Sequence, residues 1–292
     1  MTAQPLSPRQ RAEKLSATLP PLLLHADRVA ASVAQGVHGR RRVGQGEAFW
    51  QFRDYQPGDS PQSIDWRQTA KADRVFVRQM EWEAAQSVWC WRDGSASMDW
   101  RSSNKLPTKR DRAELLMLAL MSLLVRAGEH VSLLGTGLPP AANRGTLVRL
   151  SEILRRERAD EARDLPTPEP LPRYGHVLLF GDFLADPREI EHSLRGFAER
   201  GVTGHLIQVL DPAEETLPYA GRVRFEGLQG ERPWLLARAE GVRAQYRDQL
   251  AAQTDAIQEI ARRTGWRCTW HRTDRSPQTA LLAAYSALAQ HL

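Results

Sequence analysis

Short apolar runs alternate with longer amphipathic stretches over most of the chain. Between the apolar runs, apolar residues recur at helical spacing, most clearly over 108–127, 146–156 and 187–200. A long helix follows residue 238, and a last helix begins at Pro277. Strands that alternate with helices predict an α/β fold with a doubly wound, mostly parallel sheet. The apolar runs of strand length are residues 87–92, 130–134, 176–180, 204–210 and 266–270.

The N-terminal part follows a different pattern. Residues 7–35 predict two short helices separated at Pro20 and Pro21, whereas residues 74–83 alternate as a strand would. We therefore expect two domains. N-terminal helices and a β-rich accessory region occupy residues 1–82, and the α/β domain occupies residues 83–292 with a hairpin insertion at about 213–240.

Composition and charge bear on the expected cellular location and on the kinds of site that the chain can hold. The formal net charge is +5, and no apolar run approaches the roughly 18 residues that cross a bilayer. The first ten residues lack the apolar region of a signal peptide. The two cysteines, Cys90 and Cys268, have no metal-ligand spacing, so a structural zinc site is not expected. We expect a cytoplasmic protein without a transmembrane segment.

A set of oxygen-bearing side chains falls where strands end. Asp93, Ser95 and Ser97 follow the first strand directly, Asp182 follows a later strand, and Thr146 opens the second helix. In a parallel sheet the carboxyl ends of the strands share one edge, where ligands bind. Carboxylate and hydroxyl oxygens suit a hard divalent cation such as Mg²⁺. In the simpler alternative, Asp93 and Ser97 only cap a helix.

This arrangement resembles the metal-ion-dependent adhesion site of von Willebrand factor type A domains. The resemblance implies that Ser95, Ser97 and Thr146 bind the ion directly, and that Asp93 and Asp182 act largely through water. It also implies that a carboxylate of a protein partner completes the coordination sphere. Thr136, in Gly135-Thr136-Gly137, lies close in sequence and competes with Thr146 for its role.

A second resemblance covers the chain from about Gly36 to its end. The chain is similar to domain-of-unknown-function family 58, a bacterial family with a type A-like domain. Members are often encoded near MoxR-type AAA+ ATPases, so the resemblance implies a non-enzymatic adaptor or assembly factor with such a partner. The segments that carry it are Gly46 to Phe49, Arg53 to Asp59, Ile64 to Arg67 and Val209 to Glu215.

Two other functions fit parts of the sequence. A metal-dependent phosphoesterase would use the same oxygen cluster, but the chain lacks a G-x-S-x-G elbow, an H-E-x-x-H motif and a P-loop lysine. No general base stands out beside the cluster, so we do not expect an enzyme. Nucleic-acid binding would use the arginine-rich stretch from Arg40 to Arg78, although acidic residues interleave with those arginines.

Overall fold

The computed structural model describes residues 21–34, 49–56, 64–71, 74–80, 86–156, 163–227 and 232–288. These residues belong to two compact units. The larger unit contains the described residues of 21–34 and 86–288, and the smaller unit those within 37–85. Among the described residues, no helix has the length and apolarity that a membrane span requires.

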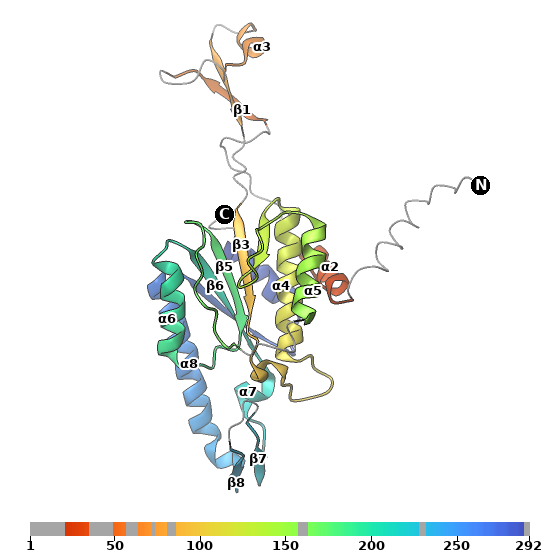
Figure 1. Ribbon diagram of the computed structural model, residues 1–292, viewed down its shortest axis with the longest axis vertical. Helices are drawn as coiled ribbons and strands as arrows, with labels where there is room; N and C mark the ends of the chain where they lie inside the picture. Colours follow the sequence, from red (N-terminus) through yellow and green to blue (C-terminus); the bar gives the residue numbers. More distant parts are fainter. Residues whose placement is uncertain are drawn as a thin grey trace, which may run out of the picture. The chain divides into compact units, whose positions relative to one another are not determined.

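The larger unit is built on a five-stranded sheet whose paired neighbours are all parallel (Figure 1). The strand order is β4-β3-β5-β6-β9, so β3, the first strand of this sheet in chain order, lies inside it. All six residues of the central strand β5 are buried, as expected for a strand covered on both faces. The strands are β3 (Ser87–Arg92), β4 (His130–Leu133), β5 (His176–Gly181), β6 (Thr203–Leu210) and β9 (Arg267–Arg272).

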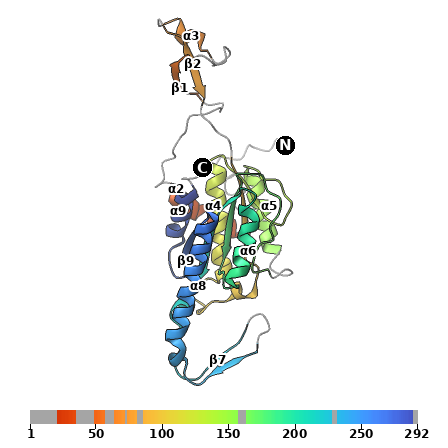
Figure 2. The ribbon, with the colours of Figure 1, turned by 90° about the vertical axis from the view of Figure 1, so that its left-hand side faces the viewer.

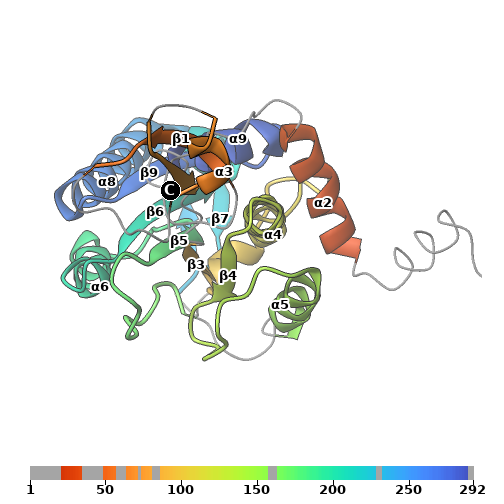
Figure 3. The same ribbon diagram turned by 90° about the horizontal axis from the view of Figure 1, so that it is seen from above.

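Helices cover both faces of this sheet (Figure 3). One face carries α6 and α8, the other carries α4, α5 and α9, and α2 packs against α4 and α9. The prediction of a doubly wound parallel sheet is therefore confirmed. The helices are α2 (Pro21–Ala34), α4 (Lys109–Arg126), α5 (Arg144–Arg156), α6 (Pro187–Ala198), α8 (Arg243–Thr264) and α9 (Pro277–Leu288).

The core on the α6 and α8 side follows from strand alternation. Residues that pair across parallel strands point to the same face. Trp89 pairs with Val177 and Leu179 with Leu206, and all four belong to one buried apolar cluster. Phe197 of α6 and Trp266, just before β9, close the cluster with their rings 6.0 Å apart. This packing fixes the strand ends at which the predicted site lies.

Short elements extend the carboxyl edge of the sheet. Helix α7 (Pro212–Thr216) follows β6 directly, and an antiparallel hairpin of β7 (Val223–Phe225) and β8 (Trp234–Leu236) comes next. Two 3-10 helices, η2 (Ala96–Asp99) and η3 (Ala239–Val242), follow β3 and β8.

The smaller unit is β-rich, as the alternation over residues 74–83 predicts. Strands β1 (Phe49–Asp54) and β2 (Phe76–Met80) pair antiparallel, and the short helix α3 (Trp66–Thr69) lies between them in sequence. The rings of Phe52 and Phe76 meet edge to face at 6.3 Å.

One part of the expected domain division requires correction. The sequence pattern predicts the N-terminal helices together with the accessory region in residues 1–82, but α2 packs on the larger unit. Its apolar residues Leu23, Ala26, Val29 and Ala30 are buried, so the physical reason is the burial of its apolar stripe. The first of the two expected helices and the boundary at residues 82 and 83 lie outside the described residues.

Candidate functional site

Two neighbouring strands bring Asp93 and Asp182 to the same edge of the sheet. Asp93 follows β3 and Asp182 follows β5, and the backbone N–H of Asp93 continues the strand pairing by donating to Phe180 O (2.8 Å). Gly181 permits this approach, since a Cβ there would lie 2.9 Å from Asp93 Cβ and 3.2 Å from its Oδ2. Both carboxylates are buried, with residue exposures of 0% and 3%.

The two serines connect these carboxylates. Ser95 N donates to Asp93 Oδ1 (2.8 Å), and the hydroxyls of Ser95 and Ser97 lie 2.9 Å apart. Ser97 Oγ donates to Asp182 Oδ2 at 2.6 Å. The structure therefore brings together four of the five predicted residues, and their oxygens form one continuous polar cluster.

An arginine on α4 holds the loop that carries the serines. Arg110 Nη2 donates to the carbonyls of Gly94 (3.1 Å) and Ser95 (3.2 Å), and its guanidinium also pairs with Asp99. Because guanidinium presents several donors in one plane, it fixes the loop at several points at once. Arg110 is thus a positioning residue for Ser95 and Ser97.

A lysine and a glutamate that the sequence analysis missed complete the cluster. Lys109 is the first residue of α4 and is fully buried, and its Nζ donates to Asp182 Oδ2 (2.9 Å) and to Glu214 Oε1. Glu214 lies on α7, where its Oε2 accepts from Asp211 N (2.9 Å) in a capping box. The sequence does signal the capping box, through Asp-Pro-Ala-Glu at 211–214, but nothing in it signals the ion pair.

The cluster holds more negative than positive charge. Three carboxylates, of Asp93, Asp182 and Glu214, accompany the single ammonium of Lys109, which leaves two negative charges unbalanced when all are ionised. Burial and then the charge of Asp182 raise the pKa of Asp93 to about 7. Burial lowers the pKa of Lys109, but Asp182 and Glu214 outweigh it and leave the pKa raised.

One oxygen of the cluster lacks a partner. Asp93 Oδ2 is buried, and no hydrogen-bond donor among the described residues reaches it. A buried carboxylate oxygen without a partner costs free energy, because it has lost water and gained nothing. This oxygen, the two serine hydroxyls and the Asp182 carboxylate match the donor set of a hard divalent cation. Within the described chain, no three His, Cys, Asp or Glu side chains group as metal ligands, so hydroxyls would be essential.

Thr146 lies at the opposite edge of the sheet from this cluster. Arg144, at the start of α5, and Arg126, at the end of α4, both pair with Asp27 (3.6 Å and 3.4 Å). Helix α4 begins at the cluster with Lys109, and its 18 residues span roughly 27 Å. The start of α5 is therefore remote from Asp93, and the structure does not bring Thr146 to the other four residues.

Thr136, the alternative to Thr146, lies on the correct side. It follows β4, the neighbour of β3, at the carboxyl edge of the sheet. Its Oγ1 donates to Leu133 O (2.8 Å) and thereby closes a local turn.

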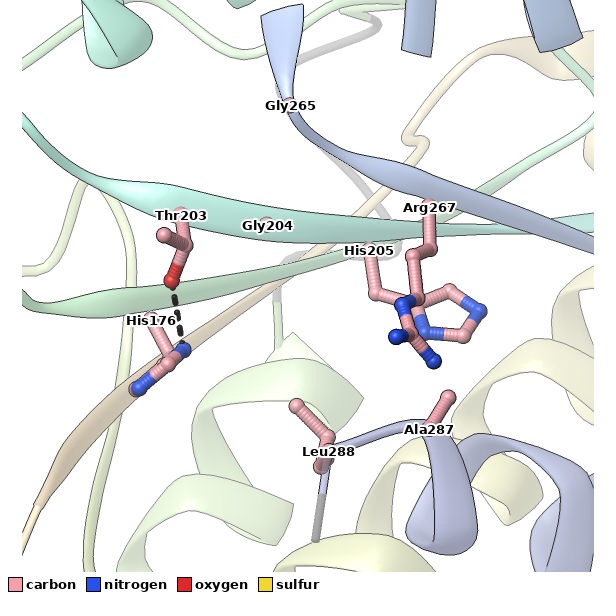
Figure 4. A pocket seen from close by; sticks show the side chains of 8 residues that line it. All are labelled: His176, Thr203, Gly204, His205, Gly265, Arg267, Ala287 and Leu288. Atoms are coloured by element: carbon pink, nitrogen blue, oxygen red, sulfur yellow. Dashed lines mark hydrogen bonds between the residues drawn. The ribbon is translucent and has the colours of Figure 1, made fainter. Parts of the chain in front are cut away.

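The buried histidines at the amino edge form a different kind of site. His176 bonds to Thr203 Oγ1 and Gln86 Oε1 (both 2.6 Å), and His205 Nε2 bonds to Thr269 Oγ1 (2.9 Å). The cavity beside them, seen in Figure 4, measures about 10 Å³, which is room for one water molecule. These hydrogen bonds go to neutral amide and hydroxyl side chains, which is typical of histidines that hold neighbouring strands together.

The arginine-rich stretch offers little further support for nucleic-acid binding. Arg40, Arg41 and Arg42 lie outside the described residues. Within the described part, Arg74 pairs with Asp54 at 3.3 Å, both being exposed. One of the expected cations is thus compensated within the chain.

Comparison with known proteins places the chain among bacterial relatives. Uncharacterized proteins of Mycobacterium tuberculosis (strain ATCC 25618 / H37Rv) and Mycobacterium bovis are each 30% identical over 224 residues, which cover 72% of this chain and 69% of theirs. Among solved structures, the conserved hypothetical protein BatB from Bacteroides thetaiotaomicron matches at 16% identity and a TM-score of 0.40, covering 70% of this chain and 100% of that one.

An aerotolerance-related membrane protein from Bacteroides fragilis matches at 14% identity and a TM-score of 0.42, with coverages of 71% and 100%. The family model described as "Protein of unknown function DUF58" matches residues 51–256, which include the Asp93 loop, Asp182 and α7. The chain therefore belongs to domain-of-unknown-function family 58.

Proposed function

We propose that the chain is a metal-dependent protein-binding module. In this proposal Asp93, Ser95, Ser97 and Asp182 hold a divalent cation, with Mg²⁺ as the expected ion, and the chain acts as an adaptor or assembly factor. The observation that carries the proposal is the buried, partnerless Oδ2 of Asp93, inside a cluster that has two unbalanced negative charges when its three carboxylates are ionised. A divalent cation would supply the two positive charges that the cluster lacks.

The residues of the chain would have different roles at such a site. Ser95 and Ser97 present hydroxyl oxygens, and Arg110 holds the backbone that carries them. Lys109 neutralises Asp182 and Glu214 in part, so that the remaining charge matches a divalent rather than a monovalent ion. Thr146 is left out of this ligand set because of its position, and Thr136 stays open as a further ligand.

For the partner we propose a MoxR-type AAA+ ATPase or its client, which would present an acidic residue to the cation. This part of the proposal rests on family membership together with the oxygen cluster. Binding of the ATPase from the same organism is expected to require Mg²⁺ and to be lost in EDTA.

Calorimetric titration with Mg²⁺ tests the cation site. We expect wild type to bind one ion and Ser97→Ala to bind at least tenfold more weakly, because Ser97 joins the two carboxylates. Thr146→Ala is the matched control and should change the affinity less than twofold. Absence of Mg²⁺ binding in wild type would refute the proposal and leave Lys109 as the permanent counter-ion of the cluster.

A further inference from the structure

The β7–β8 hairpin carries an apolar face on which Trp234 is exposed, while Val223, Phe225 and Leu236 are half-buried. Cross-strand pairing places Val223 opposite Leu236 and Phe225 opposite Trp234, so these four side chains share one face of the hairpin. Trp234 is 61% exposed, and Leu235, on the other face, is 51% exposed. An isolated two-stranded hairpin is at best marginally stable in water. An exposed apolar side chain on such a hairpin therefore indicates a surface on which another segment packs.

The base of the hairpin is fixed and lies beside the candidate cation site. Arg243, at the start of α8, donates to the carbonyls of Leu217 and Tyr219 (both 2.9 Å), and Gly221 N donates to Glu240 (2.7 Å). The ring of Tyr219 meets Phe225 edge to face at 5.8 Å. Figures 1 and 2 show the hairpin at the end of the sheet that carries α7, beside the start of α8.

Electrostatics link the same tyrosine to the cluster. Burial raises the pKa of Tyr219, and the charges of Asp211 and Glu214 raise it further. Glu214 in turn pairs with Lys109, which pairs with Asp182. The apolar face of the hairpin and the cation cluster are therefore connected through Phe225, Tyr219 and α7.

Three arginines lie close in sequence to the two strands of the hairpin. Arg222 precedes β7, Arg232 lies two residues before Trp234, and Arg238 lies two residues after Leu236; all three are exposed. No acidic side chain in the described part of the chain forms an ion pair with any of the three, whereas Arg224 pairs with Glu226 at 3.0 Å. Trp and Arg side chains are enriched at the energetic centres of protein interfaces, so an exposed tryptophan with exposed arginines close to it in sequence indicates such a surface.

We propose that this hairpin face binds an acidic, amphipathic segment of a partner protein. An apolar side chain of that segment packs on Trp234, and its carboxylates pair with Arg222, Arg232 and Arg238. This proposal specifies the kind of segment that a partner protein would present. It rests on the proposed function in one respect only, namely that the chain binds a protein. The hairpin contact itself needs no cation.

A phage-displayed library of random twelve-residue peptides, selected in EDTA, tests the surface. Selected peptides are expected to be enriched in Asp and Glu together with large apolar residues. A synthetic copy of a selected peptide, followed by fluorescence anisotropy, should bind Trp234→Ala at least tenfold more weakly than wild type. Its affinity should also fall as salt is added, since exposed charges are screened.

Two variants serve as controls. Trp270→Ala removes another tryptophan of similar exposure (58%) from β9 and should leave the affinity unchanged. Asp93→Asn should also leave peptide binding intact, which separates failure of the hairpin proposal from failure of the cation site. The proposal is overturned if no peptide is selected, if selected peptides lack acidic residues, or if Trp234→Ala binds them as wild type does.

Discussion

The two edges of the central sheet both bury titratable groups, but they neutralise them differently. At the amino edge, His176 and His205 bond to Gln86, Thr203 and Thr269, which are neutral. At the carboxyl edge, the carboxylates of Asp93, Asp182 and Glu214 outnumber the ammonium of Lys109. Burial alone therefore does not distinguish the two edges. The charge imbalance is what sets the candidate site at the carboxyl edge apart.

The largest effect on stability is expected from removing Lys109 at the carboxyl edge. Lys109→Met leaves the buried Asp182 and the half-buried Glu214 without their counter-charge, and breaking a buried ion pair in this way costs about 3–5 kcal/mol of unfolding free energy. Urea denaturation in EDTA measures the loss. Lys105→Met, which changes an exposed lysine four residues away, should stay within about 0.5 kcal/mol of wild type. Equal free energies of unfolding of the two variants would show that Lys109 does not stabilise the carboxylates at the carboxyl edge.

A smaller effect is expected from crowding the carboxyl edge. In Gly181→Ala the new Cβ would lie 2.9 Å from Asp93 Cβ, and such overpacking typically costs about 1–3 kcal/mol. The same change should weaken Mg²⁺ binding, because it pushes Asp93 away from Asp182. Gly241→Ala is the matched control, since nothing lies within 4 Å of the Cβ added there. If both variants bind Mg²⁺ equally, the close approach of the two strand ends is unimportant.

The finest distinction between the edges lies in their pH dependence. The pKa of Asp93 is raised from 3.8 to about 7, so its contribution to stability is complete below pH 3.8 and is lost as pH rises. Burial and then Arg267 lower the pKa of His205 from 6.5 to about 4, so its contribution is complete above pH 6.5 and is lost as pH falls.

Between about pH 4.5 and 6 the two groups therefore act in opposite directions. Relative to wild type in EDTA, Asp93→Asn should gain stability with rising pH, by up to roughly 1.4 kcal/mol per pH unit. His205→Gln should lose stability with rising pH to a similar degree. Urea titrations across this window measure both slopes, and slopes of the same sign would contradict the assignment.

The fold and much of the site were predictable because both depend on local pattern. Strand β3 was predicted at Ser87–Arg92 and is found there, since its apolar run ends sharply at Asp93. Asp93 and Asp182 meet because each follows a strand and the two strands are neighbours. Parallel strands bring such residues to one edge without any further information.

The position of Thr146 could not be predicted in the same way. After β4 the chain turns back along the strand, and Ala141 forms an antiparallel bridge with Val131. Helix α5 therefore begins near the amino edge, although its sequence is that of an ordinary helix start. The direction in which a loop leaves a strand depends on tertiary packing, which one helix pattern does not contain.

Lys109 was missed for a related reason. A lysine in the first turn of a helix is usually solvated, and a fully buried lysine is rare unless it is paired. Its partners, Asp182 and Glu214, are 73 and 105 residues away. Only the folded chain shows that the three charges meet.

The packing of α2 has a consequence for how the chain is made. Helix α2 is near the start of the chain, yet it packs against α9, which ends at Leu288. At synthesis rates of about 5–20 residues per second, α9 emerges from the ribosome roughly 10–50 s after α2. During that time the apolar stripe of α2 lacks one of its final neighbours, so its packing is completed only at the end of synthesis.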